Sequence, residues 1–94
     1  MSAICVGTIR VKNASAWEQY RSRVGATISQ YGGEILFRGS AERCYPGATP
    51  NDAVVALKFI DLAAANRWHD SPEYQALVPI REIAADVSLV LYAC

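Results

Sequence analysis

The fold of this chain is decided by the stretch from Val54-Val-Ala-Leu-Lys-Phe-Ile60 through Trp68-His-Asp-Ser-Pro-Glu-Tyr-Gln-Ala-Leu77 to Arg81. The first run is apolar and β-branched, which predicts a strand over 53–60. Asp61 can cap a helix over 62–69. Ser71, followed by a proline and an acid, is the start signal of a second helix. A last strand is predicted over 86–93.

The first half of the chain repeats the alternation of strand and helix. Residues 3–11 are apolar and β-branched, and they predict a strand. Asn13 or Ser15 can cap the next helix, and Ser15-Ala-Trp-Glu18 matches the capping-box pattern. Apolar side chains recur at helical spacing up to Gly32-Gly33, which ends the helix. A second strand is predicted from residue 34 to about residue 43.

The order β-α-β-β-α-β is that of the ferredoxin-like fold, an α+β architecture with a four-stranded antiparallel sheet and both helices on one face. The chain has 94 residues, which is one domain over 1–94. Prolines, glycine and polar residues between 43 and 53 predict a loop of roughly ten residues, which is long for a hairpin.

The strands alternate between two sets of side chains, and the two sets predict what each face of the sheet meets. One set is almost wholly apolar and is expected to face the helices: Cys5, Gly7, Ile9, Val11, Ile35, Phe37, Gly39, Val55, Leu57, Phe59, Val87, Leu89 and Leu91. The other set is mixed: Ile4, Val6, Thr8, Arg10, Leu36, Arg38, Ser40, Val54, Ala56, Lys58, Ile60, Ser88, Val90 and Tyr92. A sheet face in water is mostly polar. We therefore expect this second face to pack on another copy of the chain, which makes a homodimeric α+β barrel.

Composition and charge narrow the class of protein. Nine basic and nine acidic residues give zero net charge without a block of one sign, so neither nucleic acid nor a membrane surface is an expected partner. No apolar run approaches the ~20 residues that span a bilayer, and no signal peptide is visible. Three widely spaced cysteines and one histidine fit a cytoplasmic protein without a metal site.

The chain resembles the bacterial family of domains of unknown function numbered 1330, within the dimeric α+β-barrel superfamily. The residues that carry the resemblance are Trp17-x-x-Tyr20, Gly32-Gly33-x-x-Leu36-x-Arg38-Gly39, and Trp68-x-x-Ser71-Pro-Glu-Tyr-Gln-Ala-Leu77 with Arg81. The loop over 42–52 departs from the family. Its members often have a Gly-Asp-Trp-like segment there, whereas this chain has Cys44-Tyr-Pro-Gly-Ala-Thr-Pro50.

The resemblance implies a fold and an assembly more than a reaction. The superfamily points toward monooxygenases and isomerases that act on aromatic or lactone substrates. No cofactor is expected, and the chain has no glycine-rich phosphate loop.

Arg38 is the first candidate for ligand binding. It lies in a largely apolar strand segment between Phe37 and Gly39, and a guanidinium there requires acceptors. Its planar fork suits the carboxylate of a small organic acid. The alternative is an ion pair with Glu34, with Glu42 or with an acid of a partner subunit. The guanidinium is expected to reach a cavity near Tyr20 or Trp68.

The other candidates have structural alternatives. Tyr20 and Trp68 can line a cavity, whereas Trp17 and Tyr31 are expected in the core. Arg81 can pair with Glu73 or Glu82, or point into the site. Ser71 fits helix capping better than a nucleophile. His69 is a weak candidate for a general base, and a histidine beside Asp70 at a helix end is commonly solvated.

Two functional hypotheses remain open from the sequence. The first is a protein that binds a small organic ligand in one cavity per subunit, with or without cofactor-independent monooxygenase or isomerase chemistry. The second is a non-catalytic module that acts by dimerising, as a stress-related or regulatory accessory. A cavity that contains Arg38 and free polar groups favours the first, and a filled interior favours the second.

Overall fold

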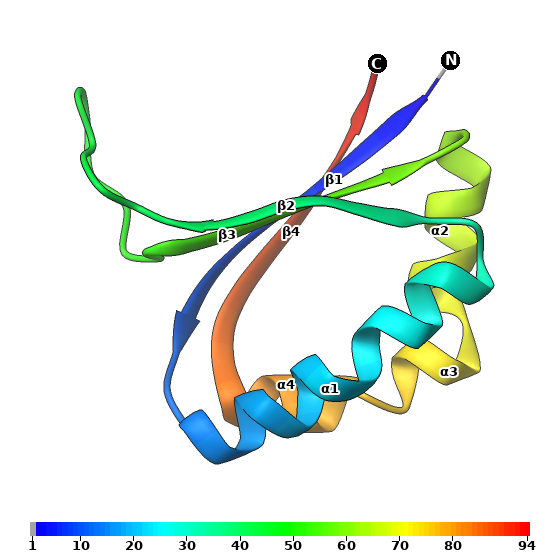
Figure 1. Ribbon diagram of the computed structural model, residues 1–94, viewed down its shortest axis with the longest axis horizontal. Coiled ribbons are helices and arrows are strands. Elements are labelled where there is room, and N and C mark those ends of the chain that lie inside the picture. Colours follow the sequence, from blue (N-terminus) through cyan, green and yellow to red (C-terminus); the bar gives the residue numbers. More distant parts are fainter. Residues whose placement is uncertain (1) are drawn as a thin grey trace.

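The computed structural model describes residues 2–94, and it shows one sheet with all helices on one of its faces (Figure 1). The elements in chain order are β1 (Ala3–Val11), α1 (Ala14–Gln30), β2 (Glu34–Ser40), β3 (Ala53–Phe59), α2 (Leu62–Asp70), α3 (Pro72–Gln75), α4 (Val78–Ala84) and β4 (Ala85–Ala93). Within the described residues, the strand order is β2-β3-β1-β4 and each neighbouring pair is antiparallel. The predicted ferredoxin-like fold is confirmed.

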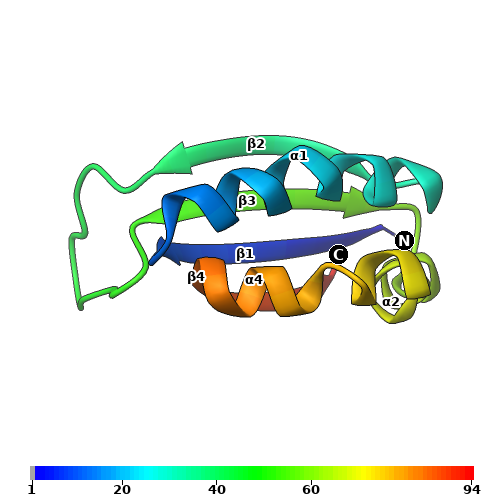
Figure 2. The ribbon, with the colours of Figure 1, turned by 90° about the horizontal axis from the view of Figure 1, so that it is seen from below.

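The helical layer has two parts that cover different regions of the sheet. Figure 2 shows α1 running along the sheet beside α4, while α2 lies near one end. The segment between β2 and β3 projects away from this body (Figure 1). The strand predicted to reach residue 43 ends at Ser40, and the chain then forms the exposed loop over 41–52.

Helix α1 begins two residues earlier than a cap at Ser15 would place it. The Asn13 side chain accepts a hydrogen bond from the Ala16 backbone N–H at 3.0 Å, while Ser15 lies inside the helix. Of the two predicted caps, Asn13 is confirmed and Ser15 is wrong, because Asn13 already satisfies a free N–H of the first turn. The helix ends before Gly32, whose φ of 77° is the left-handed conformation that glycine adopts at low cost.

The Ser-Pro signal starts a helix as predicted, but the helix is divided. Ser71 Oγ accepts a hydrogen bond from the Tyr74 backbone N–H at 3.1 Å. Helix α3 ends at Gln75, and α4 begins at Val78. Pro79 lies in the first turn of α4 and has no N–H to donate to the preceding turn, which favours the break between α3 and α4.

Removing the Ser71 hydroxyl is expected to lower stability. Ser71 Oγ donates to the Trp68 carbonyl at 2.7 Å and accepts from Tyr74, so Ser71→Ala breaks both bonds in a buried position. We expect the free energy of unfolding to fall by about 0.5–2 kcal/mol, the range for a lost helix cap. Urea denaturation measures it. A variant with the same free energy of unfolding as the wild type would contradict the capping role.

A bulge in β2 reverses the faces predicted for part of this strand. Ile35 pairs with Leu57, but Phe37 pairs with Ala56, so Leu36 is an extra residue in the ladder. Paired residues share a face, and beyond the bulge each side chain therefore moves to the opposite face. Phe37 and Gly39 lie on the outer face with Ala56 and Val54, whereas Arg38 pairs with Val55 and faces the helices. The predicted sides of these three residues were wrong.

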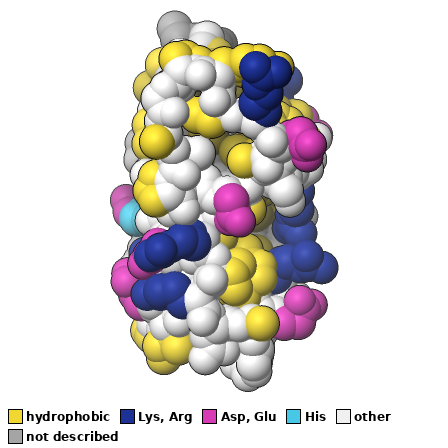
Figure 3. Space-filling view, turned by 90° about the vertical axis from the view of Figure 1, so that its left-hand side faces the viewer, with side chains coloured by type: hydrophobic (Ala, Val, Ile, Leu, Met, Phe, Trp, Pro, Cys, Tyr) yellow, Lys and Arg dark blue, Asp and Glu magenta, His cyan; other side chains and the backbone are white. Residues whose placement is uncertain are grey.

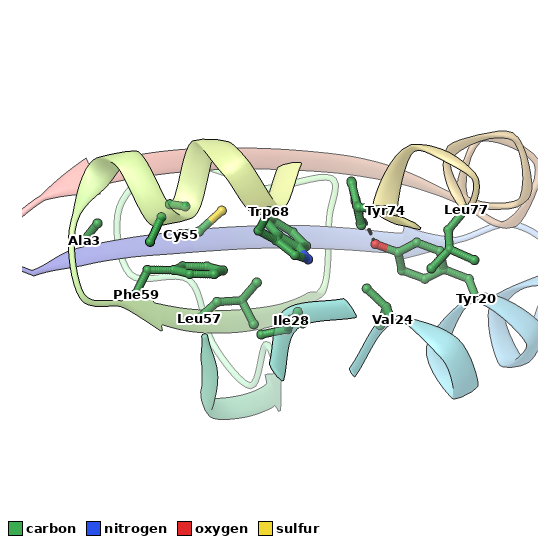
Figure 4. Close-up of a cluster of buried hydrophobic side chains, with 12 residues drawn as sticks. Ala3, Cys5, Tyr20, Val24, Ile28, Leu57, Phe59, Trp68, Tyr74 and Leu77 are labelled. Carbon is green, nitrogen blue, oxygen red and sulfur yellow. Dashed lines mark hydrogen bonds between the residues drawn. The ribbon is translucent and has the colours of Figure 1, made fainter. Parts of the chain in front are cut away.

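The core lies between α1, α2, α3 and the sheet. Its largest fully buried side chains are Trp68, Tyr74 and Phe59. Trp68 is central: its ring centroid lies 4.3 Å from that of Tyr74 and 5.6 Å from that of Phe59 (Figure 4). Within residues 2–94, no helix is both long enough and apolar enough to cross a membrane.

Candidate functional site

A cavity of about 320 Å³ lies between α1 and the helix-facing side of the sheet. Most of its walls are aliphatic and aromatic. Helix α1 contributes Trp17, Tyr20 and Val24, and α2 contributes Trp68 at the far wall. Ligand sites of small molecules are typically clefts of about 300–1,000 Å³ with mainly apolar walls and few polar groups. Size and lining therefore both suit a small organic molecule.

Basic side chains lie near the opening of the cavity. Figure 3 shows hydrophobic side chains in a hollow and Lys and Arg side chains on either side of it. Arg38 of β2 and Arg21 of α1 both line the cavity, and both residues are exposed. Strand β2 is at the edge of the sheet, so its Arg38 lies at the rim of the cavity. The structure thus places cations where an entering ligand first meets the protein.

Arg38 is not buried, which corrects one premise of the sequence argument. Its side chain is exposed because β2 is an edge strand. Throughout residues 2–94, no acidic side chain forms an ion pair with it, and neither Glu34 nor Glu42 takes the predicted alternative role. Arg21 lies 4.0 Å from Glu18 (Nε to Oε2), a weak exposed pair. The Arg38 guanidinium therefore keeps its hydrogen-bonding capacity.

Three polar side chains, two of them buried and one partly buried, form a chain of hydrogen bonds that begins at the cavity residue Tyr20. Arg81 Nη1 donates to the Tyr74 hydroxyl at 3.0 Å, and this hydroxyl lies 3.0 Å from the Tyr20 hydroxyl (Figure 4). Arg81 Nη2 also contacts Glu82 Oε1 at 3.1 Å, one of the two predicted partners. The other one, Glu73, instead accepts a hydrogen bond from Tyr31 at 2.5 Å. Burial first, and then the neighbouring Tyr74, raise the pKa of Tyr20 far above its ordinary value.

Trp68 belongs both to the cavity wall and to the hydrophobic core. Its Nε1–H donates to Thr27 Oγ1 at 3.1 Å, and Thr27 in turn donates to the Val24 carbonyl at 2.7 Å. The indole is therefore held in one orientation between the aromatic cluster and the cavity wall. Thr27 was not singled out from the sequence, since a threonine on a helix rarely signals a partner for a buried indole.

The candidate residues divide into two groups. Arg38, Tyr20 and Trp68 line the same cavity, and Arg81 reaches it only through Tyr74 and Tyr20. Ser71 caps α3 and does not line this cavity.

His69 lies apart from the main cavity. It is exposed, with Nδ1 3.0 Å from Asp70 Oδ1, and it borders a separate, smaller cavity beside Cys5. In that arrangement it has no contact with the arginines of the larger cavity. Burial raises the pKa of the Cys5 thiol, so this thiol is not activated as a nucleophile.

Two cavity residues were not predicted as such. Trp17 was assigned to the core, but it is partly exposed and stacks on Tyr20 with ring centroids 5.3 Å apart at the cavity wall. Arg21 lies off the apolar stripe of α1. Its position four residues after Trp17 and next to Tyr20 was the available signal, because residues three or four apart share a helix face.

No metal centre accompanies the cavity in the part of the chain that the structure describes. Across residues 2–94, no three His, Cys, Asp or Glu side chains lie close enough together to hold a metal ion. The polar groups available for chemistry are hydroxyls and guanidinium groups, which bind and polarise oxygen atoms.

Fold and site together define an α+β protein of the ferredoxin-like type with a ligand-sized cavity between its sheet and its first helix. The chain belongs to the family described as Domain of unknown function (DUF1330), whose model matches residues 2–93. The predicted family membership is confirmed. No curated protein matches this chain in sequence.

Solved structures of similar fold include proteins with and without a known activity. A protein of unknown function from Rhodopseudomonas palustris has a TM-score of 0.82 at 19% identity, covering 97% of this chain and 80% of its own. SnoaB, a cofactor-independent oxygenase from Streptomyces nogalater, has a TM-score of 0.72 at 15% identity, covering 99% and 92%. A dimeric ferredoxin-like protein of unknown function from Jannaschia sp. CCS1 has a TM-score of 0.78 at 10% identity and covers 100% of both chains. At these identities the likeness is one of fold.

Proposed function

We propose that this protein is a homodimer that binds a small organic acid in the cavity of each subunit. The observation that carries the proposal is Arg38, a guanidinium without an acidic partner among residues 2–94, at the rim of an otherwise mainly apolar cavity. A carboxylate at the rim accepts two parallel hydrogen bonds from the Arg38 fork. The apolar body of the acid then lies against Trp17, Val24 and Trp68.

The volume and the lining side chains of the cavity indicate which acids fit it. A cavity of about 320 Å³ accommodates one six-membered ring with short substituents, and the aromatic side chains of α1 and α2 offer flat surfaces to such a ring. Aromatic and alicyclic carboxylates are therefore the proposed ligand class. Arg21 of α1 also lines the cavity and adds a second positive charge, which attracts anions.

The homodimer is proposed from the outer face of the sheet. Across all four strands runs a row of paired apolar residues, from Phe37 through Ala56 and Val6 to Val90. Phe37 is 56% exposed and Val90 is 43% exposed in the single chain. An exposed apolar row on a sheet is the usual mark of an interface. A second copy is the proposed partner, since the Jannaschia protein of the same fold is a dimer.

A catalytic role is the second candidate function, and the likeness to SnoaB favours it. In that case the bound acid is itself converted, by oxygenation or isomerisation without a cofactor. A cytoplasmic location is part of the proposal, because Cys5, Cys44 and Cys94 are all free thiols. A purely accessory role through dimerisation predicts that no acid binds.

The binding proposal is tested with Arg38→Met and a panel of benzoate, phenylacetate and cyclohexanecarboxylate. Arg38 is exposed, so the ligand-free variant should unfold within about 0.5 kcal/mol of the wild type. At ten times Kd, a bound acid should stabilise the wild type by about 1.4 kcal/mol and raise its Tm by roughly 5–10 °C. Arg38→Met should lose most of that increase, and thermal-shift and calorimetric titrations measure it.

The matched control is Arg67→Met, which removes an exposed arginine of α2 that does not line the cavity. It makes the same change in net charge, and its response to each acid should equal that of the wild type. Two results would overturn the proposal: an acid panel that leaves the wild type unshifted, or an Arg38→Met variant that responds as strongly as the wild type.

A further inference from the structure

The hydrogen-bond chain that begins at Tyr20 has more donors than acceptors. Arg81 carries only N–H donors, so the oxygen of Tyr74 accepts in the 3.0 Å contact between them. The two tyrosine hydroxyls carry one proton each, and only one of these protons can lie in the 3.0 Å contact between their oxygens. One O–H proton is therefore left over.

The leftover proton has no acceptor in the part of the chain that the structure describes. Across residues 2–94, the bonds of these hydroxyls are those with each other and with Arg81. Both rings are more than nine-tenths buried, with exposures of 7% for Tyr20 and 0% for Tyr74. A buried O–H without an acceptor costs free energy that a suitably placed acceptor restores. The fold therefore leaves a hydrogen-bond donor in this region for something else.

Charge decides which hydroxyl keeps the free proton. The guanidinium of Arg81 donates to Tyr74 and polarises its O–H bond, which makes Tyr74 the better donor of the pair. Tyr74 then donates to the Tyr20 oxygen, and the Tyr20 O–H is the free donor. Of the three residues, only Tyr20 lines the cavity. Tyr20 is thus the member of this chain through which the charge of Arg81 can act on a ligand in the cavity.

We propose that Tyr20, on the α1 wall of the cavity, donates a hydrogen bond to a second oxygen of the ligand while Arg38 of β2 holds the carboxylate. This inference rests on the proposed function and narrows the ligand to acids that carry a further acceptor, such as oxo acids of a ring system. The relay runs from Arg81 through Tyr74 and Tyr20 to that oxygen. No proton is transferred. The relay binds the acceptor oxygen and draws electron density toward it.

The Tyr20 hydroxyl stays protonated in this role. Burial is the first cause that raises its pKa, with Tyr74 as the second, so the hydroxyl remains a donor at neutral pH. The hydrogen bond that the Tyr20 oxygen accepts from Tyr74 limits the directions in which the Tyr20 O–H can point. A ligand oxygen therefore meets a donor that is already oriented.

The test compares two acids of the same shape in two proteins. The acids are 3-acetylbenzoate, which has a ketone oxygen, and 3-isopropenylbenzoate, in which a CH₂ group replaces that oxygen. The wild type should bind the ketone about three- to tenfold more tightly, the range of one neutral hydrogen bond. Tyr20→Phe should abolish this preference and still bind the isopropenyl acid. Calorimetric titration gives the four dissociation constants.

A second readout reports on the bond itself. The ketone stretching frequency of bound 3-acetylbenzoate should be lower in the wild type than in Tyr20→Phe, because a donor to the carbonyl weakens the C=O bond. Tyr45→Phe is the matched control: its hydroxyl lies on an exposed loop outside the cavity, and it should match the wild type in both measurements.

The failures of the two proposals are distinguishable. If both acids bind the wild type equally, or if Tyr20→Phe keeps the preference for the ketone, the Tyr20 inference is overturned and acid binding at Arg38 stands. If neither of these two acids binds the wild type, the Tyr20 inference is overturned, and the acid-binding proposal is overturned with it only when benzoate, phenylacetate and cyclohexanecarboxylate also leave the wild type unshifted. An unchanged carbonyl frequency in Tyr20→Phe also overturns the relay, whatever the affinities.

Discussion

Replacing Trp68 with alanine is expected to lower the free energy of unfolding by about 3–5 kcal/mol, the range for deleting a buried large aromatic side chain. Trp68 is only 2% exposed and packs on Tyr74 and Phe59. Its removal also eliminates the hydrogen bond that Trp68 Nε1 donates to Thr27 Oγ1. Since domains of this size are stable by about 5–15 kcal/mol, the loss is a large part of the total.

Urea denaturation at one fixed protein concentration measures this effect, because the stability of a dimer depends on concentration. Ile83→Ala is the control: Ile83 is 63% exposed on α4, and its truncation should change stability by about 0.5 kcal/mol or less. A Trp68→Ala variant no less stable than Ile83→Ala would show that the aromatic cluster around Trp68 is not the main source of stability.

Placing an aspartate on the outer face of the sheet is expected to dissociate the proposed homodimer. Phe37→Asp puts a charge into the apolar row that continues through Ala56 and Val6. An unpaired charge in a dry interface costs several kcal/mol, which is a loss of more than a hundredfold in dimer affinity. Because Phe37 is 56% exposed in the single chain, the fold of the monomer should persist.

Sedimentation equilibrium measures the dimer dissociation constant, and circular dichroism verifies the fold. Val6→Asp, at the centre of the same row, should also dissociate the dimer. Ser22→Asp introduces the same charge on an exposed position of α1 and should leave the dimer intact. A wild type that sediments as a monomer at micromolar concentration would refute the homodimer. Equal effects of Phe37→Asp and Ser22→Asp would place the interface elsewhere.

Strand β2 contributes to both the proposed dimer contact and the cavity rim. Phe37 and Arg38 are neighbours on opposite faces, one in the proposed dimer contact and the other at the cavity rim. Dissociating the dimer therefore removes a support of the strand that carries Arg38. The acid titrations of Arg38→Met are best compared with those of Phe37→Asp. The second variant keeps the Arg38 guanidinium but loses the dimer contact of the neighbouring residue.

The sequence by itself determined the elements and their order. Strand and helix periods differ, and helix starts depend on side chains within four residues, so both are local. The caps at Asp61 and Ser71 were predicted from such short patterns and are confirmed by their hydrogen bonds. The order of elements, with short connections, leaves few sheet topologies, and the ferredoxin-like one was predicted correctly. Arg38, Tyr20 and Trp68 were named as ligand-binding candidates from the sequence and line one cavity, but their role in binding stays a prediction.

Only the tertiary structure decided which way Arg38 faces and what Arg81 does. The bulge at Leu36 exists only in the pairing of β2 with β3, and a one-residue shift turns every later side chain to the other face. Alternation along a single strand cannot reveal it. The chain from Arg81 to Tyr74 and Tyr20 joins residues on α4, α3 and α1. Such a contact depends on how the helices pack on the sheet, a long-range property that no local pattern encodes.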